Sequence, residues 1–361
     1  MSTEYTDADA FIKEGVLFAG RGDLDNAIMC FTEALALDPN LADACNNRGY
    51  AYARKGDYDR AIADFTQALA LDPTNASAYT NRGAACLYKG DRDQAIADFT
   101  QALRFDPNDA KVYSNRGVAY GQKGDYARAL ADHTQAIKLD PNEAKSYNNR
   151  GFAYRSKGDY DRAIADYTQA LKLDQNYALA YGERGLAYAR KGDSDQALAD
   201  YTQAMRLDPN YALAYGERGL AYARKGDDQA LADYTQAIRL DPNYAAACYN
   251  RGVAYYGKGD YDQAIADFTQ TIKLDPNDAT AYNGRGAAYL GKGDSDQAVA
   301  DFTQAVRLDP DDATAYNGRG AAYLGKGDYE QAVEDFTQAV RLDPNDAEAQ
   351  KNLELARRRG Q

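Results

Sequence analysis

An Arg-Gly dipeptide recurs through most of the chain at a spacing of 34 residues. A fixed period of this length is typical of a repeat array, in which each unit packs mainly against its neighbours. One step is 33 residues long, and the first glycine of the series lacks its arginine. The sequence therefore predicts ten repeats rather than two or three globular domains. The glycines are Gly15, Gly49, Gly83, Gly117, Gly151, Gly185, Gly219, Gly252, Gly286 and Gly320.

The ten repeats account for residues 8–346 when each of these glycines stands at position 8. The repeats are then 8–41, 42–75, 76–109, 110–143, 144–177, 178–211, 212–244, 245–278, 279–312 and 313–346. We expect residues 1–7 to form a flexible N-terminus. Residues 347–361 continue the helical pattern but carry Glu354 at the glycine position. We expect them to form a polar capping helix and a tail, because the end of such an array faces solvent.

Each repeat carries the signals of two helices. The first helix ends at Lys-Gly, as at Lys55-Gly56, where glycine suits the left-handed conformation. The following aspartate, such as Asp57, is a favourable N-cap for the second helix. The second helix ends at Leu-Asp-Pro, and all nine prolines occupy this place. Two repeats differ: Gln175 replaces proline in repeat five, which predicts a longer or frayed helix. Repeat seven lacks one residue before Gln229, which predicts a tightened or distorted turn.

Small and aromatic residues alternate at fixed positions of the repeat. Position 8 is glycine and positions 20 and 27 are mostly alanine, whereas positions 4, 11 and 24 are mostly Tyr or Phe. Positions 4, 8 and 11 share one face of the first helix, because an α-helix turns by about 100° per residue. We therefore expect the aromatic rings of one helix to pack against the small residues of the next.

These positions resemble those of the tetratricopeptide repeat, a helix–turn–helix unit of 34 residues. The resemblance covers residues 8–346 and implies an all-α fold, a right-handed superhelical α-solenoid of helix–turn–helix repeats. It also implies a non-catalytic protein–protein interaction scaffold with a concave groove lined by the first helices. The sequence departs from the family pattern in having tyrosine instead of tryptophan at position 4 and arginine instead of leucine at position 7.

The arginine at position 7 has a candidate partner in its own repeat. Nine repeats carry both Arg at position 7 and Asp at position 23, as with Arg150 and Asp166, and repeat one lacks both, with Glu14 and Cys30. This joint absence predicts an Arg–Asp pair within each of the nine repeats.

The opposite face of the first helices carries a row of asparagines at position 6. An asparagine amide both donates and accepts hydrogen bonds, so a row of them can hold the backbone of an extended peptide. The row resembles the asparagine ladder of some peptide-binding members of the family. The alternative is a set of solvated polar residues. The row consists of Asn47, Asn81, Asn115, Asn149 and Asn250.

Cations and apolar residues accompany this row. Lys111, Lys145 and Arg155 give repeats four and five a cationic lining, which suits an acidic peptide unless the charges are simply solvated. Position 9 is mostly apolar, and Tyr256 adds a further ring in repeat eight, so we expect an apolar groove floor.

Composition excludes several classes of partner and location. The 42 basic and 55 acidic side chains give a net charge of −13, so we expect binding neither to nucleic acid nor to anionic membranes. No stretch has the roughly 20 apolar residues of a membrane helix, and the N-terminus does not resemble a signal peptide. The four cysteines have no paired spacing, which indicates reduced thiols in a cytoplasmic protein.

Residues for catalysis or cofactor binding are scarce. His133 is the single histidine and replaces the aromatic ring of position 24, so we interpret it as a core residue. The Gly-x-x-x-x-Gly-Lys pattern at Gly286 lacks the Ser or Thr of a phosphate loop. We therefore expect no metal, no cofactor and no enzymatic activity. The main hypothesis is a scaffold that binds a protein or peptide segment in its groove, and the alternative is a structural solenoid that self-associates into oligomers through its ends.

Overall fold

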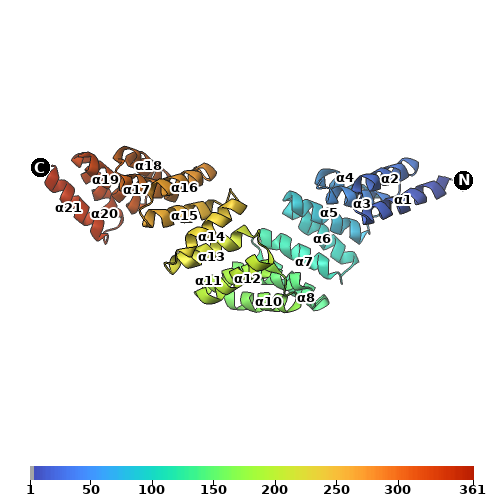
Figure 1. Cartoon of the computed structure of the whole chain (residues 1–361). Helices are drawn as coiled ribbons and strands as arrows, with labels where there is room; N and C mark the ends of the chain where they lie inside the picture. Colours follow the sequence, from blue (N-terminus) through green and yellow to red (C-terminus); the bar gives the residue numbers. More distant parts are fainter. Residues whose placement is uncertain (1–3) are drawn as a thin grey trace. The chain divides into compact units, whose positions relative to one another are not determined.

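Figure 1 shows the computed structural model of the chain, which describes residues 4–361 and the side chains of residues 7–361. Within this range all regular structure is α-helical, and the helices follow one another as pairs joined by short turns. This confirms the all-α architecture of helix–turn–helix repeats. The chain divides into an N-terminal part that ends at Ala187 and a C-terminal part that begins at Tyr188.

Two helices serve each repeat, and in repeats two to ten the first of them begins at the alanine of position 1. The N-terminal part contains α1 (Glu4–Gly20), α2 (Leu24–Leu37), α3 (Ala42–Arg54), α4 (Tyr58–Leu71), α5 (Ala76–Lys89), α6 (Arg92–Phe105), α7 (Ala110–Gln122), α8 (Tyr126–Leu139), α9 (Ala144–Ser156) and α10 (Tyr160–Leu173). The helix α11 (Ala178–Lys191) runs across the division. The C-terminal part contains α12 (Ser194–Leu207), α13 (Ala212–Arg224), α14 (Gln229–Leu240), α15 (Ala245–Gly257), α16 (Tyr261–Leu274), α17 (Ala279–Lys292), α18 (Ser295–Leu308), α19 (Ala313–Lys326), α20 (Tyr329–Leu342) and α21 (Ala347–Arg359).

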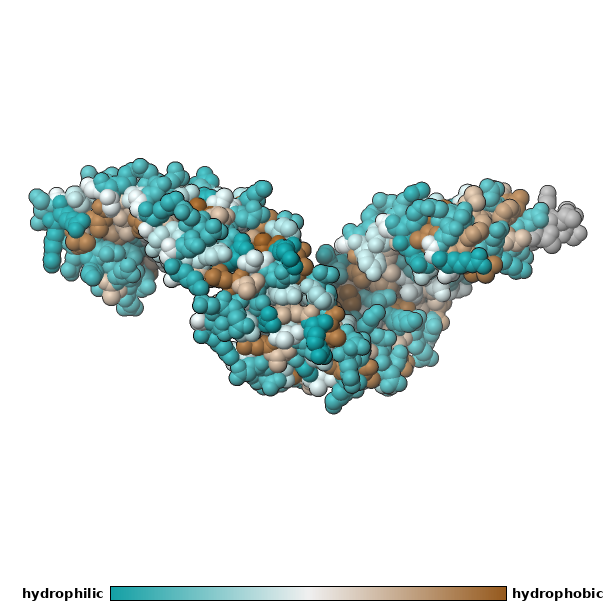
Figure 2. All heavy atoms as spheres, in the orientation of Figure 1, coloured by the Kyte–Doolittle hydropathy of each residue, from teal (hydrophilic) through white to brown (hydrophobic). Residues whose placement is uncertain are grey.

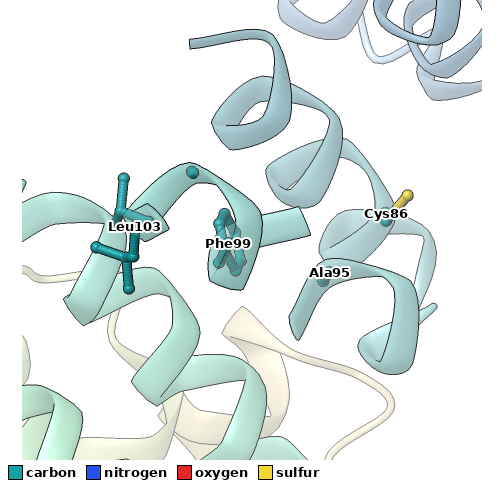
Figure 3. Close-up of a cluster of buried hydrophobic side chains, with 6 residues drawn as sticks. Cys86, Ala95, Phe99 and Leu103 are labelled. Atoms are coloured by element: carbon teal, nitrogen blue, oxygen red, sulfur yellow. The ribbon is translucent and has the colours of Figure 1, made fainter. Parts of the chain in front are cut away.

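The core is a series of small clusters between successive helices. In repeat three, Ala95, Phe99 and Leu103 project from α6 and pack with Cys86 of α5 and Val112 of α7 (Figure 3). Each second helix therefore packs between the first helix of its own repeat and the first helix of the next one. Some residues of the opposite face of the first helices, such as Ala84 of α5, also pack against these clusters, whereas others, such as Tyr50 and Phe152, are exposed.

The glycine at position 8 lets the aromatic ring at position 24 approach the backbone of the first helix. A Cβ atom on Gly83 would lie 2.9 Å from Cε1 of Phe99, which is closer than real side chains come. The same close approach occurs in nine repeats, which confirms the predicted packing of rings on small residues. The glycines concerned are Gly15, Gly49, Gly83, Gly117, Gly151, Gly219, Gly252, Gly286 and Gly320.

The helix ends follow the predicted signals, with two informative exceptions. Gly56 has a φ of 82°, and the Asp57 side chain accepts a hydrogen bond from the backbone N–H of Arg60 at the start of α4. In repeat five the expectation of a longer or frayed helix is wrong, because α10 ends at Leu173 although proline is absent. There the Asp174 side chain accepts a 2.9 Å hydrogen bond from the backbone N–H of Asn176. The aspartate therefore builds this turn without proline.

The missing residue of repeat seven distorts the turn, as predicted, but does not tighten it, because four residues separate α13 from α14 and only three separate α3 from α4. The helix α14 has 12 residues where most second helices have 14, and Asp228 at its N-cap makes no side-chain capping bond. The Asp227 side chain instead accepts a hydrogen bond from the backbone N–H of Gln229 at 2.9 Å. The packing of the repeat survives, because Tyr234 is still buried.

The two ends of the described range are helical. Residues 1–3 lie outside this range, and Glu4–Gly20 form α1, so residues 4–7 are helical, while the flexibility of residues 1–7 stays a prediction. At the other end, Leu353 and Ala356 of α21 pack on Phe336 of α20. None of the described helices is long and apolar enough to cross a membrane. On the face that Figure 2 shows, hydrophobic residues form separate patches among hydrophilic ones.

Candidate functional site

The predicted Arg–Asp pairs form, and they are bidentate. In repeat three, Nε and Nη2 of Arg82 each donate a 2.8 Å hydrogen bond to a carboxylate oxygen of Asp98, which is 2% exposed. This hydrogen bonding raises the pKa of the Arg82 guanidinium above its usual value. Repeat six spans the division between the two parts, and eight of the other repeats contain the pair. The pairs are Arg48–Asp64, Arg82–Asp98, Arg116–Asp132, Arg150–Asp166, Arg218–Asp233, Arg251–Asp267, Arg285–Asp301 and Arg319–Asp335.

Each of these arginines also joins its repeat to the preceding one. Nη1 of Arg82 donates a 3.2 Å hydrogen bond to Oγ1 of Thr66 in the second helix of repeat two. The guanidinium carbon also lies 5.8 Å from the ring centre of Tyr79, the residue at position 4. The arginine therefore links two second helices from the packed side of a first helix. This fixes how the first helices stand next to one another and hence how their opposite faces are spaced.

Two asparagines of the predicted row are tied to the neighbouring first helix. Nδ2 of Asn81 donates a 3.0 Å hydrogen bond to Oδ1 of Asn46, and Nδ2 of Asn149 donates a 3.4 Å bond to Oγ of Ser114. Each bond uses one of the two N–H groups of the amide, so Oδ1 and the second N–H keep hydrogen-bonding capacity. These amides are held in place by the stacking of the repeats.

The predicted residues gather in separate pockets of the first-helix face. Asn47 and Asn81 line one pocket of about 360 Å³ together with the exposed ring of Tyr50. In the C-terminal part, Asn250 lines a pocket of about 490 Å³ with Val253. A further pocket, of about 270 Å³, brings together four predicted residues, and these are Lys111, Asn115, Lys145 and Asn149.

The charges of repeats four and five are more balanced than the sequence suggested. Arg155 forms a 2.9 Å ion pair with Glu183, which is 9% exposed, and its guanidinium carbon lies 5.0 Å from the ring centre of Phe152. Asp140 and Glu143 line the same pocket as the two lysines of the predicted cationic lining. These carboxylates offset the positive charge, so the preference for an acidic partner stays a prediction.

Apolar side chains are exposed on the same face. The residues at position 9 include Tyr50, Phe152 and Val253, which are 48%, 43% and 45% exposed. Tyr256 is 41% exposed, and its ring lies 5.8 Å from that of Tyr261. Because burying such rings is favourable, they are suitable anchors for the side chains of a partner.

The part of the chain that the structure describes has few side chains suited to metal binding or thiol chemistry. It contains no group of three or more His, Cys, Asp or Glu side chains that could hold a metal ion. The four cysteines are buried and free, and desolvation raises the pKa of the Cys86 thiol to about 11. A thiol with a raised pKa is a poor nucleophile near neutral pH.

Comparison with protein families identifies the repeat. Models described as tetratricopeptide repeat match residues 42–75, 110–143, 144–177 and 245–278, which coincide with repeats two, four, five and eight. Other models described as tetratricopeptide repeat match residues 166–199 and 283–347. Models described as TPR repeat match residues 15–56, 83–124, 185–226 and 227–259. The chain belongs to the tetratricopeptide repeat family. No curated protein matches its sequence.

A solved structure shows the same fold. The array is similar to a chain of the APC/C hetero-tetramer Cut9-Hcn1, with 18% identity, a TM-score of 0.55 and coverage of 97% of this chain and 76% of that chain. It also matches yeast Tom70, with 18% identity, a TM-score of 0.44 and coverage of 98% and 95%. YrrB, described as a TPR protein with an unusual peptide-binding site, matches with 24% identity, a TM-score of 0.44 and coverage of 54% and 97%.

Some functional features of this tetratricopeptide array were not predicted from its sequence. The threonine that accepts from each arginine follows the position 24 residue in all ten repeats, and this regularity is the signal in the sequence for the contact. The core of repeats five and six also contains buried polar side chains. Ser146, Asn148 and Glu183 are buried, and the Tyr167 hydroxyl donates a 3.4 Å hydrogen bond to Glu183.

Proposed function

We propose that this tetratricopeptide protein is a non-catalytic scaffold that binds an extended peptide along the first-helix face of repeats two to five. The observation that carries the proposal is the tethering of Asn81 and Asn149 to the neighbouring first helix. A tethered amide loses little conformational entropy when it accepts from or donates to a peptide backbone, so such a row is favourable for binding.

Exposed rings on the same face support the proposal. Tyr50 and Phe152 lie one helical turn from the asparagines of their own helices, Asn47 and Asn149. A peptide that bonds the amides through its backbone can therefore place apolar side chains against these rings. Membership of the family supports a protein partner in general, and the choice of the groove is our inference.

The experiment selects peptides from a random display library on the immobilised full chain and measures the affinity of one by calorimetry. The variants are Asn81→Ala and Asn149→Ala. We expect each to weaken binding by about tenfold, because each removes a tethered amide that is worth roughly one or two hydrogen bonds.

The matched control is Asn352→Ala. Nδ2 of Asn352 donates an equivalent 3.2 Å hydrogen bond to Oδ1 of Asn317, but this pair lies in α21 and α19, outside the proposed groove. Melting curves should show equal stability losses for Asn352→Ala and Asn81→Ala, and only Asn81→Ala should weaken the peptide. The proposal would be contradicted if no peptide were enriched. It would also be contradicted if the wild type and all three variants bound the peptide with equal affinity.

Self-association through the ends has less support. The outer side of α21 exposes charged residues, among them Lys351, Glu354 and the three arginines at 357–359, which disfavour stacking on another copy.

The four reduced and buried cysteines support a reducing compartment such as the cytoplasm.

A further inference from the structure

A second cavity opens on the first-helix face of repeats four to six, within the N-terminal part. It has a volume of about 540 Å³ and lies between α7, α8, α9 and the start of α11. Asn149 lines both this cavity and the pocket of the two lysines, so the cavity adjoins the proposed groove.

The cavity extends beside the small residue at position 12 of repeat four. Position 12 is Leu87, Leu290 and Leu324 in repeats three, nine and ten, but it is Gly121 in repeat four. A Cβ atom on Gly121 would meet nothing closer than Cβ of Ala129 at 3.9 Å. The space beside this glycine is therefore open and large enough for several more heavy atoms.

Two buried polar atoms in the walls have no hydrogen-bond partner. They are Nδ1 of His133 and Oδ1 of Asn148, and the two residues are only 2% and 4% exposed. A buried polar atom without a partner costs about 1–3 kcal/mol, so a ligand that satisfies both atoms recovers this free energy. His133 occupies a place where six repeats have phenylalanine, which would need no partner.

The remaining walls define the chemistry of the ligand. Val118, Phe152 and Leu179 are apolar, and Phe152 and Leu179 are each 43% exposed at the surface. Glu183 is paired with Arg155, so its negative charge is compensated. The ligand should therefore be uncharged and mostly apolar, with one group that both donates and accepts a hydrogen bond.

We propose that this cavity binds the phenol side chain of a tyrosine in the partner peptide, an inference that rests on the proposed peptide-binding function. The phenol hydroxyl donates to Oδ1 of Asn148 and accepts from the Nδ1–H of His133. The ring lies against the apolar walls, in the space that Gly121 leaves. Phenylalanine would leave both buried atoms without partners, and the charged carboxylate of Asp or Glu would lose its solvation.

The experiment uses 4-methylphenol, the side-chain analogue of tyrosine, with the full chain. His133 is the single histidine, so the imidazole signals in a ¹H–¹⁵N NMR spectrum report on one site. We expect a saturable shift of these signals with 4-methylphenol. Toluene, the analogue of phenylalanine, should bind at least about fivefold more weakly, because it forms neither hydrogen bond.

Two variants test the site by filling it. Gly121→Leu places in repeat four the residue that repeats three, nine and ten already carry, and His133→Phe restores the common ring. Saturation-transfer NMR should show loss of 4-methylphenol binding in Gly121→Leu, and in His133→Phe equal, weak binding of 4-methylphenol and toluene. The two variants test the site separately, so the result stands if one of them does not fold.

The outcomes separate this inference from the proposed function. No saturable shift, equal affinity for toluene in the wild type, or unchanged binding in Gly121→Leu would overturn the phenol site, while the effect of Asn81→Ala on peptides would still support the groove. A selected peptide with a tyrosine whose affinity is unchanged in Gly121→Leu would overturn the inference as well.

Discussion

Repeats four to six and repeats nine and ten share the same helix–turn–helix backbone but differ in the residues at position 6. In repeats nine and ten, position 6 is Gly284 and Gly318, and added Cβ atoms there would lie 2.8 and 2.4 Å from the rings of Phe268 and Phe302 in the preceding repeats. These rings fill the space and close the stack. In repeats five and six, position 6 is Asn149 and Glu183. The stack there is polar and open.

The difference shows that the contacts that hold the repeats together and the residues of the proposed binding face occupy different positions of the repeat. The Arg–Asp pair and the glycine at position 8 are present in both regions, and they hold the helices together. Positions 6, 9 and 12 of the first helix differ between the regions, and in the proposed function they decide whether the exposed face can hold a ligand.

The largest effect should be the same in both regions. Asp166→Ala and Asp335→Ala each leave a largely buried arginine without its carboxylate, in repeats five and ten. We expect each to lower the free energy of unfolding by about 3–5 kcal/mol in chemical denaturation.

The control for this pair is Asp296→Ala, which removes an exposed ion pair with Lys326. Its expected cost is below about 1 kcal/mol. If all three variants lost the same free energy of unfolding, the buried Arg–Asp pair would not be what stabilises both regions.

A fall in pH should destabilise repeat four through His133. Repeats nine and ten carry phenylalanine at the same position. Burial lowers the pKa of His133 to about 4, whereas an unfolded imidazole titrates near 6.5. Between these values the unfolded chain binds more protons than the folded chain, so stability is lost as the pH falls from about 6.5 to about 4. We expect the wild type to lose about 3 kcal/mol relative to His133→Phe over this range.

Denaturation midpoints of the two proteins at several pH values measure this difference, because other titrating groups largely cancel in the comparison. A difference that stays constant from pH 7 to pH 4 would mean that the imidazole is not protected from protons.

The sequence predicts contacts within one repeat better than contacts between repeats. The helices and the Arg–Asp pairs were predictable, because their signals lie within one repeat. The bonds of Asn81 and Asn149 join residues 35 positions apart in different repeats, so they depend on how the repeats stack. The compensation of Arg155 by Glu183 and the cavity beside Gly121 have the same origin. A single-repeat pattern does not contain this information.

Exchanging the residues at position 6 should sharpen the contrast. Gly318→Asn places a Cβ atom against the ring of Phe302 in the closed region, and we expect a loss of about 2 kcal/mol from overpacking. The reverse change in the open region, Asn149→Gly, creates no clash and should cost less than about 1 kcal/mol. Equal losses in urea denaturation would show that the two regions are packed alike.

The smallest expected effect is a gain in stability. Gly121→Ala adds a methyl group in open space within α7, and alanine favours a helix over glycine by roughly 0.5–1 kcal/mol. A small rise in the denaturation midpoint is therefore expected, whereas Gly318→Ala should lower it. A loss of stability in Gly121→Ala would mean that the space beside this glycine is not open.

Hydrogen–deuterium exchange of the full chain with and without a selected peptide tests the central claim most directly. We expect slower exchange in the first helices α3, α5, α7 and α9 when the peptide is bound, with α17 and α19 unchanged. Protection confined to the even-numbered helices, or to repeats nine and ten, would contradict it.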